Sequence, residues 1–85
     1  MYEIYTANNR TEKLLYCYIK ERQDIEGKLQ RLKQSPRTEI GAHPLHGKLA
    51  GKWSCWLGEN IRMIYSIDDR NKRIIVEAVG THKIY

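Results

Sequence analysis

The sequence predicts an α+β domain with the element order β-α-α-β-β-β, in which two N-terminal helices pack on one face of a small, mainly antiparallel four-stranded sheet. Three observations lead to this prediction. The 85 residues suffice for one domain with one core, so we assign 1–85 to a single unit. Apolar residues follow helix-type spacing before position 34 and strand-type alternation after position 52. A glycine- and proline-containing segment, 37–51, separates the two halves.

The chain is expected to begin with a short strand and a helix. Residues 2–5 alternate weakly and are rich in β-prone side chains. Two asparagines at positions 8 and 9 can cap a helix over 10–22, whose ends are charged. The residues expected on its inner face are Leu14, Leu15 and Tyr18.

A second helix is predicted over 24–34. Its narrow apolar stripe, at i, i+4 and i+7, consists of Ile25, Leu29 and Leu32. Gly27 weakens the helix by about 1 kcal/mol relative to alanine. The helix should end at Ser35, because the residue before a proline is pushed out of the α region.

Three strands are predicted in the C-terminal half, over 52–57, 61–67 and 73–79. Polar turns at Gly58 to Asn60 and at 68–72 separate them. In the first strand the two faces carry Trp53, Cys55 and Leu57 against Ser54 and Trp56. In the second they carry Ile61, Met63, Tyr65 and Ile67 against Arg62, Ile64 and Ser66.

Arg62 stands out because it interrupts an otherwise apolar strand. Two explanations are open at this point. The side chain either faces a ligand or pairs with a carboxylate on the neighbouring strand, such as Glu77.

Composition narrows the class of protein. The formal net charge of +5 favours anionic partners, nucleic acid first, although a solvated mixed surface explains it equally well. No run approaches the ~20 apolar residues that span a bilayer, and the start lacks the pattern of a signal peptide, so we expect no membrane partner and a cytoplasmic location. Two cysteines among apolar residues indicate reduced thiols.

Candidate chemistry concentrates in the stretch from Gly41 to Tyr65, to which the third histidine, His82, would have to return. The loop 37–51 should lay His43, His46, Lys48 and Lys52 near the sheet edge. A simple meander places position 82 at the opposite end of the sheet from Lys52. Metal binding is not expected, because the histidines and cysteines form no CxxC or HxxxH pair. No nucleophile elbow and no phosphate loop are present.

Three motifs, HPLHGKLAGKWS, IRMIY and VGTH, occur in this order within residues 37–85. In order and spacing this part of the chain resembles the RelE superfamily of ribonuclease toxins from toxin–antitoxin pairs, with the YoeB-like and YafQ-like members closest. The resemblance implies a cytoplasmic endoribonuclease that cuts messenger RNA in the ribosomal A site. Its implied partners are the messenger RNA, the ribosome with its 16S rRNA, and a cognate antitoxin that neutralises it. The implied reaction is a metal-free attack of a ribose 2′-hydroxyl on the adjacent phosphate, without a cofactor. A homodimer is left open.

The resemblance also implies roles for individual residues. Arg62 matches the strand arginine that would clamp the scissile phosphate, His82 the general acid, and His43 the general base, with His46 as an alternative base. Histidine suits both proton transfers because its ordinary pKa, about 6.5, lies near working pH. The residues expected to contact RNA are His46, Lys48, Lys52, Lys83 and Tyr85.

The sequence departs from the family pattern in two places. The strand 53–57 lacks the lysines that RelE carries there, and the terminal aromatic residue lies three positions beyond His82. Two other functions therefore remain as alternatives. One is a ParE-like toxin that shares the fold and inhibits DNA gyrase, and the other is a non-catalytic RNA-binding module.

Overall fold

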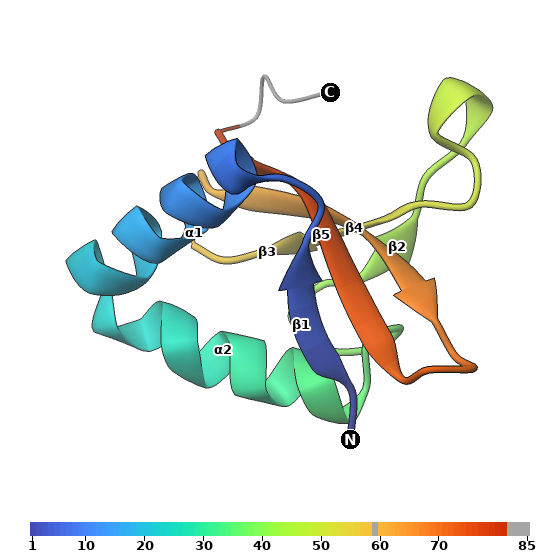
Figure 1. Cartoon of the computed structure of the whole chain (residues 1–85), viewed down its shortest axis with the longest axis horizontal. Helices are drawn as coiled ribbons and strands as arrows, with labels where there is room; N and C mark the ends of the chain where they lie inside the picture. The colour runs from blue at the N-terminus through green and yellow to red at the C-terminus, as the bar shows by residue number, and fades with distance from the viewer. Residues whose placement is uncertain (59, 82–85) are drawn as a thin grey trace.

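The structure is a computed structural model that describes residues 1–58 and 60–81. Figure 1 shows a single twisted sheet with both helices on one side of it. The sheet has five strands in the order β1-β5-β4-β3-β2. The elements in chain order are β1 (Glu3–Thr6), α1 (Asn9–Glu21), α2 (Gln23–Gln34), β2 (His43–Pro44), the 3-10 turn η1 (Gly47–Leu49), β3 (Trp53–Trp56), β4 (Arg62–Asp68) and β5 (Arg73–Gly80). The predicted α+β class and the two N-terminal helices are confirmed.

The sheet differs from the prediction by one strand. β2 pairs with β3 through His43 opposite Ser54 and Pro44 opposite Trp53. A two-residue strand that contains proline has no alternation to detect, which is why the sequence indicated only a loop there. The remaining pairs are antiparallel except β1, which runs parallel to β5. The two helices provide the crossover that a parallel pair needs.

Asn8 caps the start of α1, and an extended residue separates the two helices. The side chain of Asn8 accepts a hydrogen bond from the backbone N–H of Thr11 at 2.8 Å, and so caps α1. The backbone of Arg22 is extended and separates α1 from α2. The buried stripe of α1 consists of Thr11 and Leu15. Leu14, expected on the inner face, is 41% exposed, because it lies about 100° around the helix from Leu15.

The core lies between the helices and one face of the sheet. The helices contribute Leu15, Ile25, Leu29 and Leu32, and the sheet contributes Cys55, Met63, Tyr65, Ile74, Val76 and Val79. The phenol of Tyr65 is buried and donates a hydrogen bond to the carbonyl of Pro36 at 2.7 Å. Burial raises the pKa of the Tyr65 hydroxyl and raises that of the Cys55 thiol to about 12.

The other face of the sheet, which we call the open face, carries no helix in the described part of the chain (Figure 1). Strand alternation and the pairing register assign its side chains. The alternation predicted for β3 and β4 is confirmed by the core cluster, which includes Cys55, Met63 and Tyr65 but neither Ser54 nor Ile64. They include Ser54, Trp56, Arg62, Ile64 and Ala78. No helix among the described residues is long and apolar enough to cross a membrane.

Candidate functional site

Arg62 is the first residue of β4, and its side chain lies on the open face. It stands directly opposite Trp56 on β3 and opposite Gly80 on β5. Its guanidinium carbon lies 4.2 Å from the centre of the Trp56 ring. An arginine at this distance from an indole is held by stacking and cation–π attraction. The cation predicted to bind phosphate is therefore stacked against an aromatic side chain.

His43, the proposed base, lies on β2 at the edge of the sheet, where its side chain is exposed. Its Nδ1 donates a hydrogen bond to the backbone carbonyl of Gly41 over 3.0 Å. A carbonyl oxygen can only accept, so the shared proton belongs to Nδ1. In the neutral ring the lone pair then resides on Nε2, which is the arrangement that a general base requires.

The sheet register relates His43 to Arg62. His43 pairs with Ser54, and Ser54 pairs with Ile64, two residues along β4 from Arg62. Neighbouring strands are about 4.8 Å apart and residues rise about 3.4 Å along a strand, so the two backbones are separated by about 10 Å across the sheet and about 7 Å along it. Two long side chains on the same face can close most of that distance around a nucleotide.

The last strand ends beside Arg62, because Gly80 is its partner on β5. Lys52 precedes Trp53, which pairs with Tyr65 further along β4. The expectation that the chain leaves β5 at the end opposite Lys52 is therefore confirmed as far as Gly80. The other predicted residues of this terminus are His82, Lys83 and Tyr85, and they lie outside the described residues.

Lys52 has a carboxylate partner. Its ammonium nitrogen lies 2.5 Å from a carboxylate oxygen of Glu77 on β5, and both side chains are about one-third exposed. Because β4 lies between β3 and β5, this ion pair spans the open face of β4. One oxygen of the carboxylate considered as a partner for Arg62 is thus bound to Lys52. The predicted RNA contact of Lys52 would have to compete with Glu77.

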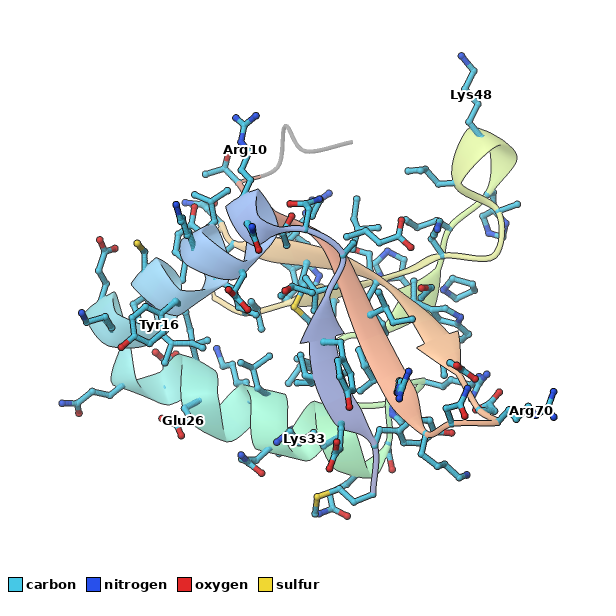
Figure 2. The ribbon with its side chains drawn as sticks, in the orientation of Figure 1. Arg10, Tyr16, Glu26, Lys33, Lys48 and Arg70 are labelled. Atoms are coloured by element: carbon cyan, nitrogen blue, oxygen red, sulfur yellow. The ribbon has the colours of Figure 1, made fainter. Side chains whose placement is uncertain are left out.

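The remaining loop candidates lie further out. His46 is exposed and directly precedes η1, and Lys48 lies within that turn. Figure 2 shows Lys48 at the tip of the loop, pointing away from the sheet. The structure therefore does not bring these two residues to Arg62, and their predicted contact with RNA would have to be made away from the Arg62 site.

The described residues contain no group of three or more His, Cys, Asp or Glu side chains that could hold a metal ion. A groove of about 380 Å³ lies on the helical side of the molecule. Its lining includes Ile4, Leu15, Tyr16, Ile19 and Leu29. Figure 2 shows Tyr16 on α1 and Lys33 on α2, two of the residues that line this groove. By the strand register, the side chain of Arg62 lies on the opposite face of the sheet.

Trp56 and Glu77 belong to the site and were not singled out as functional from the sequence. Both had a detectable signal. Trp56 lies on the same strand face as Ser54, which is the face opposite the core positions. An aromatic residue on that face does not serve the core, which points to another role. Glu77 interrupts an apolar strand as Arg62 does, and its chain position lies at the register shift between Ile64 and Tyr65.

The sequence matches no protein-family model, and no curated protein matches it. Solved structures do match. A YoeB/ParE toxin from Agrobacterium tumefaciens is 21% identical, with a TM-score of 0.73 over 96% of this chain and 99% of that one. The heterotetrameric YoeB-YefM toxin-antitoxin complex from Staphylococcus aureus has a chain that is 18% identical, with a TM-score of 0.75 over 96% and 98%.

A third match is YafQ from E. coli strain BL21(DE3), which is 20% identical with a TM-score of 0.68 over 96% of this chain and 94% of that one. All three cover nearly the whole of both chains, so the similarity extends over the complete arrangement of helices and sheet. This chain has the RelE/YoeB-like toxin fold.

Proposed function

We propose that this chain is an endoribonuclease toxin that cleaves messenger RNA in the ribosomal A site. The observation that carries the proposal is the Nδ1 hydrogen bond of His43 to Gly41, which presents Nε2 as a base on the same sheet face as the guanidinium of Arg62. A base beside a phosphate-binding cation is what attack by a 2′-hydroxyl requires. The shared fold with a YoeB-YefM toxin-antitoxin complex supports the coarser part of the proposal, that the chain is a toxin.

The proposed reaction has one bond-forming and one bond-breaking step. Nε2 of His43 removes the proton of a ribose 2′-hydroxyl, and the oxygen attacks the adjacent phosphorus. The bond between phosphorus and the 5′-oxygen breaks, and His82 supplies the proton that this oxygen takes up. The products carry a 2′,3′-cyclic phosphate and a 5′-hydroxyl. Each proton transfer by a positioned histidine contributes about 100- to 10,000-fold to the rate.

Arg62 binds the phosphate in this scheme. Its planar N–H groups match the geometry of two phosphate oxygens, and its charge offsets the negative charge that grows during attack. His82 is assigned to the same site because it follows Gly80, the partner of Arg62, by only two residues. Two residues span at most about 7 Å, so the chain itself limits how far His82 can lie from Gly80.

The proposed partners follow from this site of action. Messenger RNA and the ribosome are the anionic partners that the net charge of +5 suits, and their location makes the cytoplasm the proposed compartment. A cognate antitoxin is the proposed inhibitor, in line with the YoeB-YefM complex that has this fold. An acidic segment would suit the basic surface.

The test uses purified protein added to translating ribosomes, with cut sites mapped by primer extension. We expect cuts from the wild type and a loss of about 100- to 1,000-fold in Arg62→Ala, the size typical for removing one group that stabilises transition-state charge. Arg70→Ala removes an equal charge from the β4–β5 turn, at the far end of the sheet in Figure 2, and should cut normally. Inhibition of gyrase supercoiling without RNA cuts would refute the proposal in favour of a ParE-like toxin.

A further inference from the structure

Trp56 joins the two halves of the proposed site. On one side its ring stacks with the guanidinium of Arg62 at 4.2 Å. On the other side the backbone N–H of Trp56 donates a hydrogen bond to the carbonyl of Ile40 at 2.9 Å, which ties β3 to the loop that leads into His43. The loop and the phosphate-binding strand are therefore connected through one residue.

The position of Trp56 leaves no room for a side chain at Gly41. A Cβ atom at position 41 would lie 2.8 Å from Cδ1 of Trp56, closer than real Cβ contacts come. Its φ of +70° is also in the region that favours glycine, and Ile40 has a φ of 46°, which is costly for a β-branched residue. The carbonyl of Gly41 then accepts the hydrogen bond from His43. Unfavourable backbone at Ile40 is thus maintained where the loop meets Trp56.

The stack has a consequence for the donors of Arg62. An unrestrained arginine side chain samples many rotamers, and fixing it in one of them costs conformational entropy. A guanidinium held over an indole ring is restricted to fewer rotamers, while its N–H groups can still donate to another group. Trp56 is 36% exposed, so the stack borders solvent on the open face, where a phosphodiester can approach.

We propose that Trp56 is a positioning residue for Arg62, which holds the guanidinium ready for a phosphodiester, and that Gly41 is required because it lets the indole take up this place. The role of the bound phosphodiester as the scissile group rests on the proposed function. The stack itself and its effect on anion binding do not depend on it.

The direct test observes the Nε–Hε signal of Arg62 in a ¹H–¹⁵N spectrum. In the wild type the ring current of Trp56 should shift Hε of Arg62 relative to its position in Trp56→Leu. A single-stranded DNA oligonucleotide, which has phosphodiesters but no 2′-hydroxyl, should move the signal on binding. In Trp56→Leu the ring-current shift should disappear. Trp56→Phe should retain a smaller shift, because it keeps an aromatic face. An unchanged Arg62 signal in Trp56→Leu would overturn the proposal.

Oligonucleotide affinity supplies the second readout. Loss of the stack should weaken binding about 2- to 30-fold in Trp56→Leu, the range that a cation–π contact of this kind supports, with partial rescue in Trp56→Phe. In an Arg62→Ala background the Trp56→Leu change should have no further effect, because its action passes through Arg62. Independent, multiplying effects of the two changes would overturn the positioning role, since they would mean that Trp56 acts without Arg62.

Tyr5 provides a matched control. It is 43% exposed on the same sheet, and its ring stacks with Arg73 at 4.8 Å. Tyr5→Leu should leave the Arg62 signal and oligonucleotide affinity unchanged, whereas a loss equal to that of Trp56→Leu would make the effect a general one and overturn the proposal. A wild-type protein that cuts no messenger RNA but shows the expected Arg62 signals would refute the proposed function and leave the positioning role intact.

Discussion

The two faces of the sheet have different chemistry although the same strands build them. The helix-covered face is apolar and closed, with Met63, Tyr65 and Ile74 fully buried beneath the helices. The open face carries a stacked cation at Arg62 and an ion pair that crosses β4. The difference teaches that stability and the proposed chemistry are carried by alternate residues of the same strands, so single substitutions can separate them.

Stability and the proposed chemistry are less separate in the middle of the open face, where two residues are buried. Ser54 is fully buried and Ile64 is 4% exposed, although no helix of the described chain lies over them. They form the row between that of Arg62 and that of the Lys52–Glu77 pair. Substitutions at these two buried positions are therefore expected to affect stability although they belong to the open face.

The largest effect is expected from His43→Gln. Removing the proposed base should lower kcat for messenger RNA cleavage by about 100- to 10,000-fold. The free energy of unfolding should change by no more than about 0.5 kcal/mol, because the side chain is exposed at the sheet edge. Single-turnover cleavage and urea denaturation measure the two quantities.

His46→Gln is the comparison within the same loop. His46 is exposed and precedes η1, and the structure does not bring it to Arg62. A larger loss of kcat in His46→Gln than in His43→Gln would move the base to His46 and break the link between the Gly41 hydrogen bond and catalysis.

Leu32→Ala tests the other face. Leu32 is fully buried in the core, so its truncation should lower the free energy of unfolding by about 2–5 kcal/mol. The cleavage rate per folded molecule should stay near that of the wild type. Leu14→Ala, at a leucine that is 41% exposed, should cost no more than about 0.5 kcal/mol. If Leu32→Ala abolished cleavage while the protein remained folded, the two faces would not be separable.

Gly41→Ala and Gly27→Ala apply the same substitution to the loop beside the open face and to helix α2. At Gly41 the added methyl group meets Trp56 and the φ of +70° is unfavourable, so stability should fall by about 1–3 kcal/mol. At Gly27, in α2, nothing lies within 4 Å of the added Cβ, and stability should rise by about 0.4–1 kcal/mol. Thermal denaturation of both variants decides this, and equal effects would contradict the tight contact at Gly41.

The last prediction concerns alkaline pH and the buried thiol of Cys55, whose effect is absent at neutral pH. The pKa of Cys55 is about 12 in the folded chain, against about 8.5 for an ordinary thiol. The stabilising contribution is fully present below pH ~8.5 and is lost as pH rises towards 12, by at most about 1.4 kcal/mol per pH unit. Tyr65 adds to this loss above pH ~10, because burial raises its pKa as well.

Cys55→Ala should flatten the dependence of unfolding free energy on pH between about pH 8.5 and 10. Cys17→Ala, at an exposed thiol, should leave the dependence unchanged. Urea denaturation across this pH range measures both. A wild-type slope that survives in Cys55→Ala would mean that another group is responsible.

Most of the fold could be predicted because burial imposes periodicity. Ile25, Leu29 and Leu32 recur at helical spacing, and the alternation of 61–67 separates Met63 and Tyr65 from Arg62. β2 could not be predicted, because its two residues owe their extended pairing to β3 rather than to their own pattern. Leu14 was placed on the wrong side of α1, since adjacent leucines leave the helix phase ambiguous.

The candidate residues of the site could be predicted from the sequence, but most of their contact partners could not. His43 and Arg62 were identified from motif and strand pattern, and the register brings them to the same face. The partners of these residues depend on tertiary distance. The indole at Arg62 and the lysine at Glu77 come from other segments of the chain, and no local pattern encodes them. The Gly41 carbonyl at His43 is only two residues away, but its contact depends on the backbone conformation of the loop.

The central claim is that the open face carries out attack by a 2′-hydroxyl, and the end groups of the cut messenger RNA test it most directly. Fragments produced by the purified protein on translating ribosomes would be analysed by mass spectrometry. The account predicts a 2′,3′-cyclic phosphate, or the phosphate that it opens to, on one fragment and a 5′-hydroxyl on the other. A 3′-hydroxyl paired with a 5′-phosphate would contradict it, because these ends form when water attacks the phosphorus and the bond to the 3′-oxygen breaks, without participation of the 2′-hydroxyl.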